Sequence, residues 1–293
     1  MTTTRFVGLG SMGAGMCRNL LQHGFPLTVD DLSAERVAEL VGAGATAGTP
    51  GPVTETVVML SVPGPKEVET VCFGDDGLLA RMQPGSVLIN LSTVNLESAR
   101  ALETAATERG VLCVDAPVTG AADGAADGSL VIMCGCTDAA LAAARPQLEA
   151  ISKSIHHMGA APAGTAAKLL TNMLWFIHVT ALSDSLSLAT RCGIDPDVFA
   201  TLVRDSAGDS WVAGHDLGNI LADDDDESFT LALCTKDLRL IGEIEDEMGY
   251  ASDLAAAARA RFGAAQERFG PQAGELAVTR LAEEAARTSI RSR

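Results

Sequence analysis

The first residues whose spacing could do chemistry are three glycines, Gly8, Gly10 and Gly13, in the pattern G-x-G-x-x-G. They follow a short apolar run and precede a segment, residues 11–22, whose apolar side chains recur at helical spacing. In that context Gly8 allows a tight turn, Gly10 lets the backbone approach a pyrophosphate, and Gly13 lets helix and strand pack closely. The free N–H groups at the helix start would then face the phosphates of a dinucleotide. The alternative is a glycine turn with a purely structural role.

An acidic residue is expected about 20 positions after such glycines, and Asp31 ends the second apolar run, "PLTVDD". Its carboxylate would accept hydrogen bonds from the ribose hydroxyls and repel a 2′-phosphate, so we expect NAD rather than NADP. Asp30 is adjacent, and the sequence leaves open which aspartate takes the ribose. The loop residues expected to bind the cofactor are Gly8, Leu9, Gly10, Ser11, Met12 and Gly13.

A second group with helical spacing lies in "GTAAKLLTNM", where Gly164, Lys168 and Asn172 stand one turn apart on one helix face. The side chains around Lys168 are apolar. Partial desolvation would disfavour the charged form of Lys168, which suits a lysine to proton transfer. The alternative is a lysine that extends its ammonium group into solvent.

A third segment, "DAPVTGA" (residues 115–121), ends another predicted strand. Ligands bind beyond the carboxyl ends of strands in a parallel sheet. Thr119 and Gly120 could offer a hydroxyl and backbone N–H groups to a carboxylate there. Taken alone, this stretch is equally compatible with an ordinary turn at a strand end.

The elements that must position these residues alternate between strand and helix over the first half of the chain. Apolar runs in "RFVGLG", "PLTVDD", "ETVVMLSV", "GSVLINLS", "GVLCVDAP" and "SLVIMCG" are separated by helical patterns. This alternation predicts an α/β fold with a parallel sheet and helices on both sides. After about residue 159 only helices are predicted: one long helix from about Gly164 to Gly193, then 196–204, 231–248 and 253–269.

Composition narrows the class of protein. The formal net charge of −17 argues against nucleic acids and anionic membranes as partners. No apolar run reaches the ~18 residues of a membrane span. The first predicted strand leaves no room for a signal peptide before it. The seven cysteines include no C-x-x-C pair, which fits reduced thiols. We therefore expect a cytoplasmic protein. Cys134 and Cys136 could share a strand face as metal ligands, but buried core residues are the better interpretation, and the acidic run 223–227 is expected to be a solvated loop.

Four segments together resemble the β-hydroxyacid dehydrogenases of the 3-hydroxyisobutyrate dehydrogenase type. They are "GLGSMGAGMCRNL", "DAPVTGA", "GTAAKLLTN" and "KDL" at residues 236–238, in the same order and at similar spacing. The resemblance implies an N-terminal Rossmann domain (1–160) joined by a long helix to an all-helical C-terminal domain (161–293), similar to that of 6-phosphogluconate dehydrogenase.

The resemblance also implies roles for particular residues. Lys168 corresponds to the catalytic lysine. The substrate-binding positions are Thr119, Gly120, Ala121, Asn172 and Lys236. The cofactor-contacting positions beyond the glycine loop and Asp31 are Val62, Pro63, Thr93 and Lys236. The chain departs from the family at Thr119-Gly120-Ala121, where Ser-Gly-Gly is usual, and at Asp184, where a glutamate is usual; the first departure adds two methyl groups and bears on the substrate.

The expected activity is NAD-dependent oxidation of a small 3-hydroxy acid, such as 3-hydroxyisobutyrate, to the semialdehyde, with no metal. A reductase of tartronate or succinic semialdehyde is the enzymatic alternative, and a non-catalytic dinucleotide-binding protein is a second one. Imine reductases share the architecture but generally replace the lysine. Trp211 is either a selectivity residue or part of the helical core. The apolar-rich helix from Gly164 to Cys192, together with the resemblance, predicts a homodimer or homotetramer.

Overall fold

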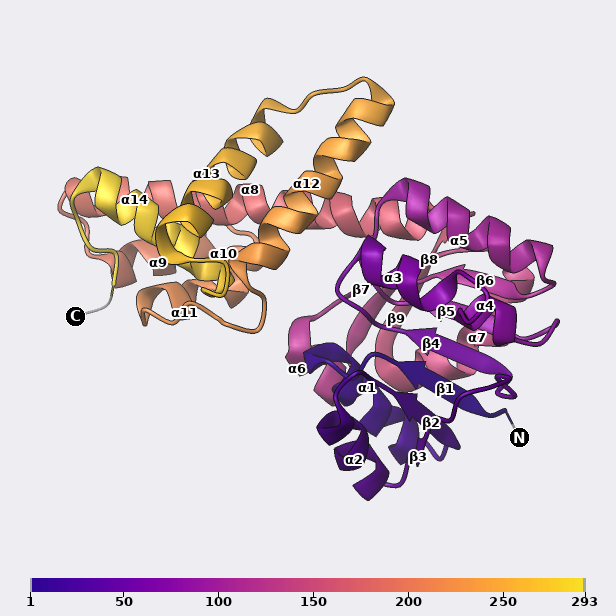
Figure 1. The fold of residues 1–293 in the computed structure, drawn as a ribbon. Helices are drawn as coiled ribbons and strands as arrows, with labels where there is room; N and C mark the ends of the chain where they lie inside the picture. Colours follow the sequence, from indigo (N-terminus) through magenta and orange to yellow (C-terminus); the bar gives the residue numbers. More distant parts are fainter. Residues whose placement is uncertain (1, 292–293) are drawn as a thin grey trace. The chain divides into compact units, whose positions relative to one another are not determined.

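The computed structural model describes residues 2–291, and their contacts divide the chain after Lys168 into two units. The division falls inside the long helix α8 (Ala163–Arg191), so this one helix contributes residues to both units. The domain limits predicted from the sequence placed the boundary a few residues earlier, just before this helix begins. Each unit is described below by itself (Figure 1).

Within the described residues, the first unit is a nine-stranded sheet covered by helices (Figure 1). Its strands are β1 (Thr4–Val7), β2 (Leu27–Asp30), β3 (Thr46–Ala47), β4 (Val57–Leu60), β5 (Val87–Asn90), β6 (Leu112–Asp115), β7 (Val118–Thr119), β8 (Leu130–Gly135) and β9 (Ser152–Gly159). Its helices are α1 (Ser11–Gln22), α2 (Ala34–Gly42), α3 (Pro65–Cys72), α4 (Leu78–Arg81), α5 (Leu96–Glu108), α6 (Ala121–Asp127) and α7 (Asp138–Ile151).

The strand order is β3-β2-β1-β4-β5-β6-β8-β7, and the first six strands are parallel. The expectation of a wholly parallel sheet is wrong beyond β6, because β8 runs antiparallel to both β6 and β7. The physical reason is the short connection. Residues 120–129 hold only the small helix α6, whereas a parallel crossover needs about a dozen residues or more. The last strand, β9, pairs parallel to β8 and was not predicted from the sequence.

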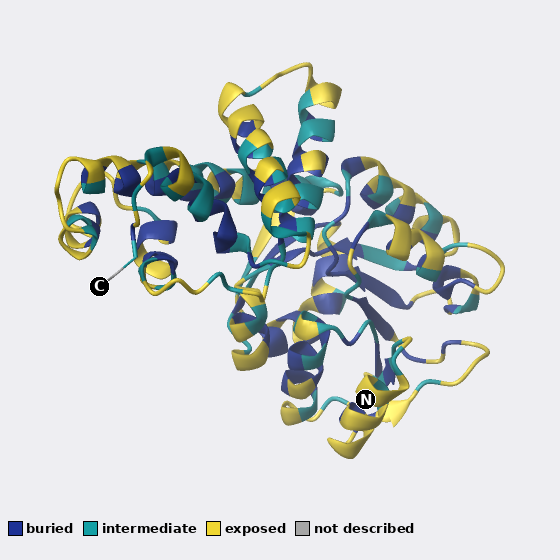
Figure 2. Cartoon of the chain, turned by 60° about the vertical axis from the view of Figure 1, so that its left-hand side comes forward, coloured by how far each residue is buried: buried dark blue, intermediate teal, exposed yellow. Residues whose placement is uncertain are grey.

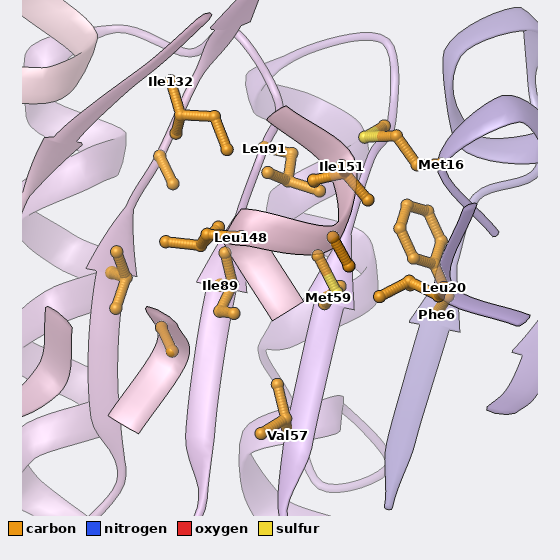
Figure 3. Close-up of a cluster of buried hydrophobic side chains, with 14 of the residues drawn as sticks. Phe6, Met16, Leu20, Val57, Met59, Ile89, Leu91, Ile132, Leu148 and Ile151 are labelled. Carbon is orange, nitrogen blue, oxygen red and sulfur yellow. The ribbon is translucent and has the colours of Figure 1, made fainter. Parts of the chain in front are cut away.

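Alternate residues of the central strands bury their side chains on opposite faces of the sheet. Val57, Met59 and Ile89 face the cluster that includes Met16 and Leu148 of helices α1 and α7 (Figure 3). The residues between them on the same strands, Val58, Leu60 and Leu88, pack with side chains from α3, α4 and α5. Strands covered on both faces read as continuous apolar runs, which is why these strands could be recognised from the sequence.

The second unit is helical in its described part, apart from an isolated bridge pair between Thr230 and Gly274. Beyond α8 its helices are α9 (Pro196–Arg204), α10 (Trp211–His215), α11 (Leu217–Leu221), α12 (Leu231–Met248), α13 (Asp253–Phe269), the 3-10 helix η1 (Glu275–Val278) and α14 (Thr279–Ala286). Their outer faces are exposed and their inner faces buried (Figure 2). Phe176 and Phe262 meet edge to face in this core, with ring centroids 5.0 Å apart.

The fold class predicted from the sequence, a Rossmann-type α/β unit joined by a long helix to an all-helical unit, is confirmed. The limits of helices α1, α9, α12 and α13 coincide with the predicted ones. Among residues 2–291, none of the helices combines the length and the apolar character needed to span a bilayer.

Candidate active site

The glycine loop between β1 and α1 is shaped by close backbone contacts. Gly8 has φ +94°, and a Cβ there would lie 2.1 Å from the carbonyl oxygen of Ser61. A Cβ on Gly13 would lie 2.0 Å from the carbonyl oxygen of Gly8, so the first turn of α1 rests directly on the loop. Gly10, the residue before α1, faces open space and has no side chain to cap the helix. This space lies in front of the free N–H groups of the helix start, where a phosphate binds favourably.

Asp31 and Asp30 have different surroundings, which decides which of them lies at the loop. The Oδ2 of Asp31 accepts a hydrogen bond from the backbone N of Leu9 at 2.6 Å, inside the glycine loop. Asp30 instead forms an ion pair with Arg5, whose Nη1 lies 3.1 Å from its Oδ2. Burial raises the pKa of Asp30, and Arg5 opposes that shift. Of the two aspartates, Asp31 is therefore the one whose carboxylate lies at the glycine loop, and its role toward a dinucleotide stays a prediction.

The ends of β4 and β5 continue the same edge of the sheet. The backbone N of Val62 donates to the Oγ of Ser92 at 2.9 Å, which joins the turn after β4 to the turn after β5. Pro63 and Thr93 follow these two residues directly. Since Ser61 also touches Gly8, the cofactor positions suggested by the resemblance lie along three neighbouring strand ends. This is where doubly wound sheets bind dinucleotides.

The predicted substrate anchor lies between β7 and α6. Thr119 ends β7, Gly120 has φ +125°, and Ala121 opens α6 with φ +53°. A left-handed backbone costs a residue with a Cβ about 1–2 kcal/mol, so the alanine that replaces the family's second glycine is held in a strained conformation. Both Gly120 and Ala121 are exposed, and the backbone there is open to a ligand.

Lys168 lies one turn into α8 and is partly buried. The apolar surroundings expected from the sequence exist only in part. Leu169 is fully buried, whereas Leu170 is 44% and Leu174 51% exposed. The two exposed leucines do not shield the lysine within this chain.

In the second unit, Asn172 and Lys236 share one carboxylate. The Nδ2 of Asn172 donates to the Oδ2 of Asp237 at 2.7 Å, and the Nζ of Lys236 lies 3.0 Å from the Oδ1 of Asp237. Asp237 is 1% exposed, so the ion pair with Lys236, rather than water, balances its charge, and within the described residues its Oδ1 accepts no hydrogen bond. Asp237 was not among the predicted site residues, although it lies inside the "KDL" segment. Its pairing with Asn172 spans 65 residues, so no local pattern could reveal it.

Trp211 is a surface residue, and its interpretation as helical core is wrong. Its side chain is 60% exposed and stacks on His215, with ring centroids 4.1 Å apart. The Nδ1 of His215 lies 2.6 Å from the Oδ1 of buried Asp216, whose Oδ2 accepts a hydrogen bond from the indole N–H of Trp175. Because Trp175 lies three residues after Asn172 on α8, this network is anchored one turn from a predicted substrate position.

Cys134 and Cys136 are buried, and burial raises the pKa of their thiols to about 12 and about 11. Among residues 2–291, no cluster of three or more histidine, cysteine or acidic side chains could hold a metal ion. The acidic run 223–227 is not simply a solvated loop, because Asp223 and Asp225 form ion pairs with Arg280.

Comparisons with known proteins identify the family of this chain. Residues 3–159 match the family described as the NAD binding domain of 6-phosphogluconate dehydrogenase, and residues 162–282 match the one described as NAD-binding of NADP-dependent 3-hydroxyisobutyrate dehydrogenase. The chain belongs to the NAD(P)-dependent β-hydroxyacid dehydrogenases and is an oxidoreductase.

Individual relatives differ in the substrates that their names give. An NAD-dependent L-serine dehydrogenase of Pseudomonas aeruginosa is 39% identical over 214 residues, 72% of each chain. A 3-hydroxyisobutyrate dehydrogenase of the same organism is 37% identical over the same share of each chain. The structure of a 3-hydroxyisobutyrate dehydrogenase of Mycobacterium tuberculosis with L-serine is similar at a TM-score of 0.87 and 29% identity, covering 96% of this chain and 99% of that one.

Proposed function

We propose that this protein oxidises the hydroxyl group of a small 3-hydroxy acid to the semialdehyde, with NAD as the oxidant. The observation that carries the proposal is the placement of Lys168. The helix that bears it starts against the strand that leads into the Thr119–Gly120 anchor, and the next turn of that helix presents Asn172. A proton acceptor and a carboxylate anchor are the two groups that such an oxidation requires.

In this proposal the substrate carboxylate is held by the hydroxyl of Thr119 and the backbone N–H groups near Gly120. The family resemblance assigns substrate contacts to Asn172 and Lys236 as well. Lys168 takes the proton of the substrate hydroxyl as the carbinol carbon is oxidised to the carbonyl. Asp237 keeps Asn172 and Lys236 in fixed orientations by bonding both. When bound, the nicotinamide supplies the two-electron acceptor. The open space at Gly10, the start of α1 and the carboxylate of Asp31 would hold the rest of the dinucleotide.

Two observations bear on the substrate. L-serine and 3-hydroxyisobutyrate, named for the two relatives, are both 3-hydroxy acids with one small substituent at C2. The methyl groups of Thr119 and Ala121 make the anchor narrower than a Ser-Gly-Gly anchor would be. We therefore favour substrates with a small C2 substituent, of which 3-hydroxyisobutyrate is the first to test.

The test is steady-state kinetics of the wild type and of Lys168→Ala with L-serine, 3-hydroxyisobutyrate, L-threonate and 3-hydroxypropionate. General acid–base catalysis is typically worth ~10²–10⁴-fold, so Lys168→Ala should lose at least about 10²-fold in kcat. Lys168→Arg should not restore activity, because a guanidinium does not readily release a proton. The affinity for NAD, measured by titration, should stay within a few-fold of the wild type.

Lys153→Ala is the matched control, since Lys153 is an exposed lysine of β9 in the same unit. It should retain wild-type kcat. If Lys168→Ala keeps more than about a tenth of the wild-type kcat, its loss is smaller than the ~10²-fold expected for such a group. This result would show that Lys168 is not the proton acceptor.

A further inference from the structure

One buried carboxylate connects the strand that leads to the substrate anchor with the helix that carries Lys168. Asp115 is the last residue of β6 and is 3% exposed. The chain continues from it through β7 to Thr119 and Gly120. Its side chain does not point to that anchor loop but binds the first turn of α8.

Both carboxylate oxygens of Asp115 accept hydrogen bonds from Thr165 in the first turn of α8. The Oδ2 accepts a hydrogen bond from the backbone N of Thr165 at 2.7 Å, and the Oδ1 accepts one from the hydroxyl of Thr165 at 2.7 Å. The backbone of Gly164 donates as well. Lys168 follows Thr165 by three residues and Gly164 by four, so it lies directly above these bonds on the helix.

The same junction is closed by backbone contacts that leave no room for the helix start to shift. A Cβ on Gly164 would lie 2.5 Å from the carbonyl oxygens of Asp115 and Met133. A Cβ on Gly135, which pairs with Asp115 across the sheet, would lie 2.7 Å from the backbone N of Gly164. The first turn of α8 is thus fixed to the ends of β6 and β8 by main-chain packing and by one carboxylate.

We propose that Asp115 is a positioning residue for the reaction: by holding the first turn of α8, it sets the position of the Lys168 amine relative to the anchor at Thr119–Gly120. The inference rests on the proposed function, because it assigns to Asp115 the placement of the proton acceptor named there. Asp115 itself touches no substrate in this scheme. Its effect on turnover passes through Thr165 and the one helical turn between Thr165 and Lys168.

The charge state of Asp115 supports this role. Burial raises the pKa of Asp115 to about 6, Glu103 adds to that shift, and the bonds from Thr165 and Gly164 oppose it. The other titratable groups facing it are the thiols of Cys113, Cys134 and Cys136, whose own pKa values are raised by burial. Protonation of Asp115 would remove an acceptor and the negative charge from the positive end of the helix.

The first experiment compares Asp115→Asn, Thr165→Val and Thr165→Ser with Thr137→Val as a matched control. Thr137 caps α7 in the same unit by accepting a hydrogen bond from the backbone N of Ala140. A misplacement of about 1 Å can cost 10²-fold in rate. Asp115→Asn should therefore lose up to about 10²-fold in kcat, with KM and NAD affinity nearly unchanged. Thr165→Val should lose less, Thr165→Ser should be close to the wild type, and Thr137→Val should keep its kcat.

A pH profile separates positioning from simple loss of stability. The kcat of the wild type should fall on the acid side through an ionisation near pH 6, and this step should be absent in Asp115→Asn. The proposal would be overturned if Asp115→Asn had a reduced kcat but its kcat still fell at low pH through the same ionisation as that of the wild type. Equal kcat values for Thr165→Val and Thr137→Val would overturn it too.

A readout without substrate keeps this proposal distinguishable from the proposed function. The chain has four lysines, Lys66, Lys153, Lys168 and Lys236, so ¹³C-dimethylation gives few NMR signals, which Lys→Arg variants assign. Thr165→Val should change the chemical shift of the Lys168 signal and the midpoint of its pH titration. The signals and titration midpoints of Lys66 and Lys153 should stay in place. An unchanged Lys168 signal would overturn the positioning role. A wild type that oxidises no hydroxy acid would refute the proposed function, while this NMR comparison would still decide the role of Asp115.

Discussion

At the scale of single residues, Asp31 should decide which dinucleotide binds. Its two oxygens accept hydrogen bonds from the backbone N atoms of Leu9 and Ser33, which fixes a negative charge at the edge of the glycine loop. A 2′-phosphate brought to that edge meets a like charge. The wild type should have a kcat/KM at least tenfold higher with NAD than with NADP, and Asp31→Ala should shrink that gap mainly by lowering the KM for NADP.

Asp30→Asn provides the comparison for Asp31→Ala. Asp30 is the neighbouring carboxylate, but its charge is taken up by Arg5. This variant should keep the preference for NAD and lose some stability, because buried Arg5 loses one of the two charged partners that it has among residues 2–291 and keeps Glu55. Wild-type enzyme that works better with NADP would contradict the role given to Asp31.

The residues that could be predicted from the sequence share a local pattern. Gly8 and Gly13 belong to the turn from β1 into α1, Asp31 directly follows the next strand β2, and Lys168 and Asn172 lie on one helix face. Asp237 could not be predicted because its partner Asn172 lies on another helix. The exposure of Trp211 was equally out of reach, since an aromatic residue at a helix start fits a core and a surface alike.

At the scale of elements, the burial of Asp115 between β6 and the start of α8 should make stability depend on pH, because burial raises the pKa of this carboxyl more than the bonds from α8 lower it. The pKa of Asp115 is about 6 in the folded chain and about 4 when it is exposed. The folded chain therefore binds this proton more tightly than the unfolded chain does. The stabilisation of the fold by protonated Asp115 is complete below about pH 4 and is lost as the pH rises through 6. This difference between the two pKa values of Asp115 corresponds to about 3 kcal/mol in the free energy of unfolding.

Calorimetry can isolate this contribution by comparing wild type with Asp115→Asn, which has no titrating group at this position. The melting temperature of the wild type, relative to that of the variant, should fall by several degrees between pH 4.5 and pH 7.5. If the melting temperatures of the wild type and of Asp115→Asn change with pH in the same way over that range, the Asp115 carboxylate titrates as it does in an unfolded chain.

The elements themselves were predictable where the physics is local. Helix α9 begins at Pro196 after Asp195, whose side chain caps it, and α12 ends at Met248, directly before Gly249, which has φ +64°. The reversal of β8 depends on the length of the α6 connection, and the apolar pattern of the strand itself carries no sign of its direction. Strand β9 alternates poorly and is mostly exposed, so its apolar pattern is weak, and its pairing with β8 brings together segments that no local signal connects.

At the scale of the whole molecule, we expect a homodimer or homotetramer. A groove of about 520 Å³ in the second unit is lined by residues of α8 and α9, including Leu182, Phe199 and Leu202. On the same two helices, Leu188 of α8 is 65% exposed, and Val198 and Leu202 of α9 are 63% and 57% exposed. Exposed apolar side chains gathered on one pair of helices are typical of a protein–protein contact.

Light scattering at micromolar concentration should give at least twice the mass of one chain. Leu202→Glu should lower that mass, because a carboxylate in an apolar contact is desolvated without a partner. Leu254→Glu is the matched control, since Leu254 on α13 is 64% exposed but lies outside the groove. A monomeric wild type would refute the expectation, and equal effects of both variants would place the contact elsewhere.

The last turn of α8 has a practical consequence for measuring ligand binding. Cys192, just after that helix, is exposed, while Cys17, Cys72, Cys134, Cys136 and Cys234 are buried and Cys113 is partly covered. Burial raises the pKa of the thiols of these six covered cysteines, so they form little reactive thiolate. The native chain should react quickly with one equivalent of a thiol reagent, and with seven equivalents in denaturant. A fluorophore could therefore be attached without mutagenesis at the end of the helix that carries Lys168, so that dinucleotide and hydroxy-acid titrations need no turnover.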